Sequence, residues 1–215
     1  MLDGLTHEQQ MLQESTRRFV DEEMLPHEDI VDREGHVPIE LGRQIESRAK
    51  EVGLFAANLP ENVGGGGLDY TCMAVIEREF GRTSHALHAW VARPTELLLA
   101  TEGDQKAQYL APCVTGAKRE LFALSEPEAG SDIMSMKSHA KRDGDDWILN
   151  GSKHFISGPL MPDFAIVFAI TGHDETPRGP RPRITAFLVD VGMPGFDIQV
   201  GYNCVSYRGY LNFKL

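Results

Sequence analysis

The first half of the chain places apolar residues at the spacing of amphipathic helices. Apolar side chains recur every seven positions from Leu5 to Phe19, and Thr6 with Gln9 forms a capping box. Similar patterns, bounded by Pro, Asp or Gly, predict further helices over residues 38–53, 69–81, 97–100 and 104–110. Pro112 is expected to close this series. The first half is therefore predicted to be a helical domain.

From about residue 121 the pattern changes to strands and tight turns. Asp143-Gly144 and Asn150-Gly151 are the two strongest hairpin dipeptides in the chain, and strand-forming residues flank each of them. Continuous apolar runs of strand length follow at residues 164–170 and 184–189. This half is predicted to be a meander of β-strands.

Three more segments complete the predicted architecture. Residues 171–183 are rich in Gly, Pro and Arg and are expected to form an exposed loop. Residues 196–200 alternate as a half-buried strand would, and residues 207–215 resemble a last strand. The prediction is an α+β chain, with an all-helical N-terminal domain over residues 1–118 and a small antiparallel β-barrel over residues 119–215.

Composition and charge narrow the possible partners. The chain has 215 residues, of which 41% are hydrophobic and 25% are charged, as in ordinary globular proteins. A net charge of -11 argues against binding nucleic acid or an anionic membrane, since such binders need a clustered basic face. Backbone N–H groups can still bind the phosphate of a small ligand.

The cysteines and the N-terminus indicate a cytoplasmic protein. Cys72, Cys113 and Cys204 are odd in number and far apart, which argues against a disulfide framework and against a zinc site. No signal-peptide core and no apolar run of membrane-spanning length is present in the sequence. His85 and His88 share a helical face without a third ligand nearby, so no metal site is assigned.

The segment over residues 122–132 carries the clearest chemical signal. It reads Phe-Ala-Leu-Ser-Glu-Pro-Glu-Ala-Gly-Ser-Asp, a strand that runs into a turn dense with hydroxyls, carboxylates and N–H groups. Such a turn can bind an anion. On chemistry alone the alternative is favoured, in which Ser131 and Asp132 satisfy only local backbone donors.

This segment closely resembles a pattern of the acyl-CoA dehydrogenase family: a hydroxyl residue, Glu-Pro and then Ala-Gly-Ser-Asp, at the start of the middle domain. Other pieces follow the family's order over nearly the whole chain. They are Leu-Pro-Glu at 59–61 with four glycines at 64–67, Glu-Gly-Asp-Gln-Lys-Ala-Gln-Tyr-Leu at 102–110, Trp-Ile-Leu-Asn-Gly-Ser-Lys at 147–153 and His-Phe-Ile-Ser at 154–157.

The resemblance implies FAD as the cofactor, with seven contacts: Phe122, Leu124, Ser125, Gly130, Ser131, Phe155 and Ser157. The Ser125 hydroxyl would lie near the N5 and O4 edge of the flavin, and hydrogen bonds there tune a hydride acceptor. Gly130 and Ser131 would contact the pyrophosphate. Phe155 would stack on the flavin, and Ser157 would offer its hydroxyl. The family more often has Thr at the two serine positions and Trp at Phe155.

Substrate contacts are expected at Ser131, Arg181 and Arg183. By the resemblance, the arginine cluster that also includes Arg178 would meet the phosphates of CoA, although a solvated loop is the alternative. No catalytic residue is assigned, and Glu126 is expected to order its own turn. In the family, the base usually belongs to a C-terminal helical domain, and these 215 residues are expected to stop before it and to be inactive alone.

The resemblance implies α,β-dehydrogenation of an acyl-CoA thioester, with hydride passing to flavin N5. Electrons would leave through an electron-transfer flavoprotein, and the full-length protein would be a homo-oligomer, either a dimer or a tetramer. One alternative is a flavin oxidase or monooxygenase on the same fold, which rapid reoxidation by air would indicate. Another is a non-catalytic module that binds an acyl thioester or a partner, which failure to hold flavin would indicate.

Overall fold

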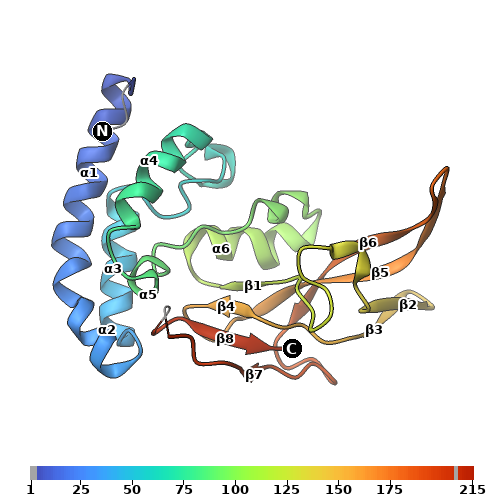
Figure 1. Ribbon diagram of the computed structural model, residues 1–215. Coiled ribbons are helices and arrows are strands. Elements are labelled where there is room, and N and C mark those ends of the chain that lie inside the picture. Colours follow the sequence, from blue (N-terminus) through green and yellow to red (C-terminus); the bar gives the residue numbers. More distant parts are fainter. Residues whose placement is uncertain (1–3, 206–207) are drawn as a thin grey trace. The chain divides into compact units, whose positions relative to one another are not determined.

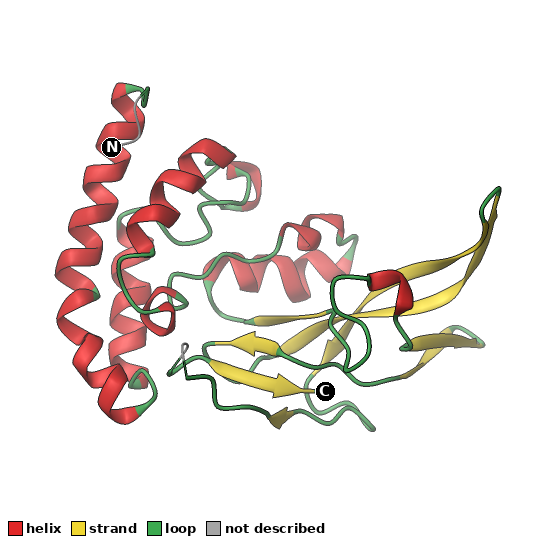
Figure 2. Ribbon diagram, in the orientation of Figure 1, coloured by secondary structure: helices red, strands yellow, loops and turns green. Residues whose placement is uncertain are grey.

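The computed structural model describes residues 4–205 and 208–215, and these form two compact units. The first comprises Met1–Lys118 with Cys204–Tyr210, and the second comprises Arg119–Asn203 with Leu211–Leu215. Among the described residues, all the strands belong to the second unit, and helices build most of the first (Figure 2).

Ten helical segments in the described part of the chain make up the first unit (Figure 1). They are α1 (His7–Glu23), η1 (Leu25–His27), α2 (Glu28–Glu34), α3 (Ile39–Glu51), η2 (Glu61–Val63), α4 (Tyr70–Phe80), α5 (His85–His88), η3 (Glu96–Ala100), η4 (Lys106–Leu110) and α6 (Ala111–Thr115).

Local capping explains why the long helices begin where the sequence predicts. Thr6 and Gln9 form the expected capping box at the start of α1, with each side chain bonded to the backbone of the other residue. At α4 the Asp69 side chain accepts from Cys72 N at 2.7 Å, and Gly81 follows the helix. These two predictions are confirmed.

The core of the first unit lies between α1, α3 and α4. Val20, Ile45 and Ile76 are fully buried there, and the rings of Phe19 and Phe80 meet edge to face with centroids 6.4 Å apart. Burial of this apolar surface is the main stabilising contribution to the unit.

The predicted stop at Pro112 is wrong. Pro112 lies in the first turn of α6, where its missing N–H would have no helical partner in any case. The helix continues to Thr115 and ends at Gly116, whose φ of +77° falls in the left-handed region. The sequence pattern does not predict the short helix α2, whereas α5 holds the helical face on which the sequence places His85 and His88.

The second unit contains two sheets. Its strands are β1 (Glu120–Ala123), β2 (His139–Asp143), β3 (Asp146–Asn150), β4 (Ile156–Gly158), β5 (Phe164–Thr176), β6 (Gly179–Asp190), β7 (Gln199–Val200) and β8 (Leu211–Lys214), with the short helix η5 (Ile133–Ser135) before β2. The larger sheet has the order β1-β5-β2-β3 with β6 on the other edge of β5, and the smaller has the order β4-β8-β7.

The closed antiparallel barrel is not formed by the described residues. Instead, two open sheets share a core of Leu121, Ala123, Ile156, Ala165 and Phe213. Strand β1 pairs in parallel with β5, and β2 meets β5 in parallel as well, so the larger sheet is mixed. The prediction of an α+β chain, with helices followed by β-sheet, is confirmed.

The prediction of an exposed loop over residues 171–183 is wrong. Strands β5 and β6 continue through these residues as a long hairpin, whose turn lies between Thr176 and Gly179. Asp143-Gly144 does form the β2–β3 hairpin, with Asp143 opposite Asp146. Asn150-Gly151 makes no hairpin, because the chain leaves β3 there for the segment before β4.

Near the end of the chain, the two predicted strands are shorter than expected. Over residues 196–200, the strand is limited to Gln199–Val200, although Phe196 and Ile198 still pack against the core. The last strand is Leu211–Lys214, and Tyr207 of that prediction lies outside the described residues. Among the described residues, no helix combines the length and the apolar character needed to cross a membrane.

Candidate functional site

The first of the predicted site residues lie on strand β1 and directly after it. Leu121 and Ala123 face the core, so the alternation of a strand turns Phe122 outward, where 45% of its surface is exposed. Its ring lies 4.9 Å from that of Phe168 on β5. Leu124 and Ser125 follow directly after the strand and are half-buried.

A tight turn follows β1. Glu126 N donates to Ala129 O at 2.9 Å, and Ala129 N donates back to Glu126 O at 3.3 Å. Gly130 and Ser131 are exposed beyond this turn, and a Cβ added at Gly130 would meet no atom within 4 Å. The Asp132 side chain accepts from Met134 N at 3.1 Å and so caps η5. An approaching phosphate would therefore have open access to the backbone at Gly130.

The segment before β4 lies against the end of β1. His154 N donates to Ser125 O at 2.9 Å, which brings Ser125 next to Phe155 although thirty positions separate them in the numbering. Phe155 adopts the left-handed conformation with φ +55°, and 62% of its surface is exposed. On β4, Ile156 is buried and Ser157 faces outward. Such an exposed, strained aromatic residue is a common feature of binding sites.

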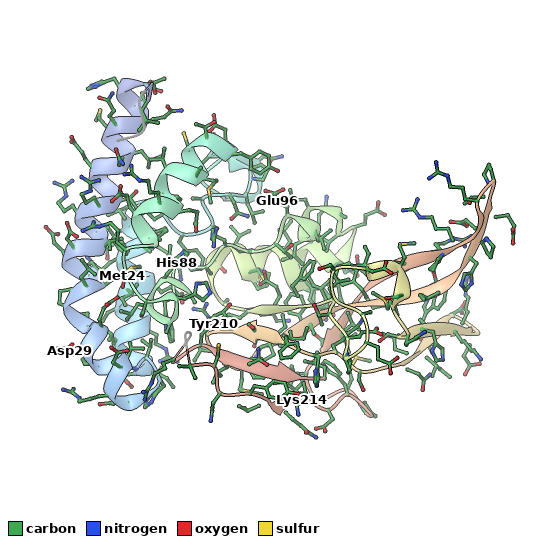
Figure 3. All side chains as sticks on the ribbon, viewed as in Figure 1. Met24, Asp29, His88, Glu96, Tyr210 and Lys214 are labelled. Atoms are coloured by element: carbon green, nitrogen blue, oxygen red, sulfur yellow. The ribbon has the colours of Figure 1, made fainter. Side chains whose placement is uncertain are left out.

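Two residues absent from the sequence-based prediction complete the aromatic surface. Tyr202 stacks on Phe155 with ring centroids 5.2 Å apart, and its hydroxyl lies 3.2 Å from His154 Nε2. The amino group of Lys214, labelled in Figure 3, lies 4.5 Å from the centre of the Tyr202 ring. Nothing in the local sequence pattern around Tyr202 indicated this contact.

Behind the turn lies an ion pair that the sequence pattern did not predict. Glu126 Oε1 and Lys153 Nζ are 2.8 Å apart, and the two side chains are 3% and 2% exposed. Glu126 also accepts from Lys137 N at 2.6 Å and from Ser138 N at 3.0 Å. The expectation that the Glu126 side chain orders its own turn is therefore wrong, because the carboxylate binds groups eleven or more residues away.

The environment of Glu126 keeps it ionised. Burial by itself would raise the pKa of this carboxyl, but the hydrogen bonds from Lys153, Ser138 and Lys137 outweigh burial and hold the pKa below its ordinary value. A carboxylate with both oxygens so engaged is a poor proton acceptor. Glu126 is thus a structural anchor in this site.

The predicted substrate contacts do not all lie together. Ser131 is near the turn, but Arg181 and Arg183 lie on the outer part of β6. Along β5, Val167 lies opposite the end of β1, and Asp174 lies opposite Arg181. At the usual rise of a strand, Val167 and Asp174 are about 23 Å apart, so Arg181 lies far from the end of β1. Arg183 is also engaged, since its Nε donates to Asp174 Oδ1 at 3.0 Å.

A cavity of about 1070 Å³ lies elsewhere in the second unit, between β3, β6 and the segment over residues 193–199. Lys153 and His154 are among its lining residues, whereas none of the seven predicted flavin contacts lines it. The candidate site is therefore an open surface at the end of β1 and the start of β4.

The residues present fit a flavin. Phe122 and Phe155 offer exposed aromatic surface for a planar ring, the Ser125 and Ser157 hydroxyls supply polar contacts, and the open backbone at Gly130 suits a phosphate. Ser157 Oγ already accepts from Asn212 Nδ2 at 3.3 Å, which orients it. The arrangement can bind and orient a cofactor, but it offers no unengaged buried carboxylate among the described residues of the turn.

Comparisons with known proteins support the same family that the sequence motifs resemble. Residues 6–117 match the model of the acyl-CoA dehydrogenase N-terminal domain, and residues 121–213 match that of the acyl-CoA dehydrogenase middle domain. A long-chain specific acyl-CoA dehydrogenase from Sus scrofa is 34% identical over 88% of this chain and 44% of its own length. The CarC subunit of a caffeyl-CoA reductase–Etf complex from Acetobacterium woodii is 32% identical over 92% of this chain and 51% of its own length.

Among solved structures, an acyl-CoA dehydrogenase from Bacillus anthracis in complex with FAD is similar, with a TM-score of 0.79 and 25% identity. The likeness covers 100% of this chain and 36% of that one. The chain spans about half the length of the curated relatives that it matches. Since both family models match in order, this chain belongs to the acyl-CoA dehydrogenase family.

Proposed function

We propose that this chain is the flavin-binding part of an enzyme that dehydrogenates an acyl-CoA thioester between its α and β carbons. The family uses FAD for this reaction, and the similar Bacillus anthracis protein was solved with FAD. One observation carries the proposal: Ser125 lies next to the Phe155–Ser157 segment, because His154 N donates a hydrogen bond to Ser125 O.

The residues at the site have distinct roles in this proposal. Phe122 and Phe155 bind the flavin ring and keep water from its faces, while Leu124 contributes backbone contacts along the ring. The hydroxyls of Ser125 and Ser157 hydrogen-bond the polar edge of the ring, and Gly130 and Ser131 contact the pyrophosphate. FAD held by these residues would supply, at its N5, the acceptor for the hydride from the β carbon of the thioester.

The remaining parts of the reaction are assigned outside the described site. We place the base that removes the α proton on a segment not included in these 215 residues, because Glu126 is committed to Lys153. Electrons are proposed to leave through an electron-transfer flavoprotein, consistent with the Etf complex that contains the Acetobacterium woodii relative. A homo-oligomer, a cytoplasmic location and CoA contacts at Ser131, Arg181 and Arg183 are further parts of the proposal.

The test is anaerobic addition of a panel of acyl-CoA thioesters to the flavin-loaded, intact protein that contains this chain. Bleaching of the visible flavin band by one thioester, with formation of its enoyl product, is the expected result. A flavin band that no thioester bleaches would contradict dehydrogenation, and rapid reoxidation by air after bleaching would indicate an oxidase instead.

A further inference from the structure

The buried ion pair behind the turn fixes the peptide that faces the proposed flavin site. Besides Glu126, Lys153 Nζ donates to a second group, the backbone carbonyl oxygen of Leu124, at 3.0 Å. Because the pair is almost fully buried, these bonds form in a medium that screens charge weakly. The Leu124 carbonyl is therefore held pointing inward, toward the amino group.

The geometry of the peptide bond then orients the next N–H. The peptide between Leu124 and Ser125 is trans and planar, so its carbonyl and its N–H point in opposite directions. With the carbonyl directed at buried Lys153, the Ser125 N–H is directed away from it, to the half-exposed side. Among the described residues, this N–H donates to no backbone carbonyl.

The same pair joins the other segments of the site. Glu126 accepts from Lys137 N and Ser138 N at the start of β2, while the backbone of Lys153 exchanges two hydrogen bonds with Leu215 after β8, at 2.8 and 3.0 Å. The segment that carries Lys153 continues directly into Phe155. The ion pair therefore links the segment after β1 both to the start of β2 and to the segment before β4.

We propose that Lys153, held by Glu126, is a positioning residue that presents the Ser125 N–H as a hydrogen-bond donor to the polar edge of the flavin ring. This inference rests on the proposed function. The positioning group acts through the Leu124–Ser125 peptide and does not itself touch the cofactor.

Two variants separate positioning from stability in the intact protein. Glu126→Gln weakens the pair but leaves Lys153 bonded to the Leu124 carbonyl. The double variant Glu126→Gln/Lys153→Met removes that donor and leaves no unpaired buried charge, which limits the loss of stability. The double variant Thr171→Val/Thr185→Val is the control, because it removes a polar pair of 2.9 Å between β5 and β6 in the same unit.

FAD affinity, followed by quenching of flavin fluorescence, is compared with the melting temperature of each protein. The expected loss of FAD affinity is about tenfold in the Glu126→Gln/Lys153→Met variant, the effect of one hydrogen bond. A smaller loss is expected in Glu126→Gln, which keeps the Lys153–Leu124 bond but weakens the contact that holds Lys153, and little loss is expected in the control. Equal affinity in the double variant and the parent would overturn the inference, as would affinities that simply follow melting temperature.

A second measurement needs no substitution. Hydrogen exchange at the Ser125 amide of the unmodified protein is expected to slow when FAD is added, because the N–H acquires an acceptor. Unchanged exchange despite FAD binding would refute the positioning role while leaving the proposed function intact. A parent protein that binds no FAD would instead refute the proposed function itself.

Discussion

Phe155 has an exposed ring and a backbone conformation that residues other than glycine rarely adopt. Its φ of +55° costs a residue other than glycine about 1–2 kcal/mol, and 62% of its surface is exposed, so its ring contributes little burial to offset this. We expect Phe155→Gly to be about 1 kcal/mol more stable than Phe155→Ala, because both lack the ring but only Gly relieves the strain. Denaturant unfolding of the two variants measures this difference, and equal stabilities would contradict a left-handed Phe155.

His88 is a buried histidine of the helical unit whose pKa is strongly lowered. Burial, aided by Arg93 and His85, lowers the pKa of His88 to about 3, and its ring stacks on Phe80 with centroids 4.6 Å apart (His88 is labelled in Figure 3). Its carboxylate neighbour Glu77 lies 3.7 Å from Nε2.

The lowered pKa of His88 predicts a loss of stability in acid. Between the ordinary histidine pKa of about 6.5 and about 3, the unfolded chain binds a proton that the folded chain does not, so stability falls as pH falls. His88→Phe removes this contribution, and its unfolding midpoint should depend less on pH between about 6.5 and 4. Exposed His7→Phe is the control, and an unchanged pH dependence in His88→Phe would contradict the prediction.

At the scale of elements, the packing of α3 depends on a glycine. A Cβ added at Gly42 would lie 2.0 Å from a ring carbon of buried Trp90. We expect Gly42→Ala to lower the free energy of unfolding by about 1–3 kcal/mol through overpacking, despite the better helix propensity of Ala. Gly81→Ala after α4 is the matched control, since its nearest contact would be an ordinary 3.4 Å. Comparable melting temperatures for the two variants would show that α3 can move away from Trp90.

The elements that sequence predicts well are those with local signals. The capping pairs at Thr6 and Asp69 act within three residues, so the pattern alone places the starts of α1 and α4. The sequence pattern does not predict the β5–β6 hairpin, because prolines such as Pro180 and Pro182 are typical of loops. They occupy alternate positions on β6, an edge strand among the described residues, where their missing N–H groups can face away from β5.

The site shows the same division between local and distant signals. The motif around Ser125 and the His-Phe-Ile-Ser segment both stand out in the sequence, and the structure joins them through one backbone hydrogen bond. The Glu126–Lys153 pair could not be predicted, because 27 positions separate its members and nothing local shows that Lys153 is buried. Only tertiary folding brings these two charges together.

At the scale of the whole molecule, each unit contains a buried carboxylate that must stay ionised. Glu79 in the first unit accepts from Arg17 Nε at 3.0 Å, and Glu126 in the second binds Lys153. Burial would raise both pKa values, but these hydrogen bonds hold both below their ordinary value. The stability that they contribute is present above the ordinary glutamate pKa and is lost as pH falls through the folded-state value.

We therefore expect both units to lose stability in acid, and urea midpoints measured from pH 7 to about pH 3 should fall across the carboxylate range. The parallel variants Glu79→Gln and Glu126→Gln should be less stable at pH 7 and show a shallower decline than the parent. Midpoints of the parent that stay constant down to about pH 3 would contradict the ionised, paired state of these two residues.

The most direct test of the central claim is the visible absorption spectrum of the purified intact protein before and after addition of FAD and gel filtration. The proposed site predicts a flavin band that remains with the protein, and a clear loss of that band in Phe155→Gly, which lacks the stacking ring. A colourless protein that leaves the spectrum of added FAD unchanged would contradict the flavin site.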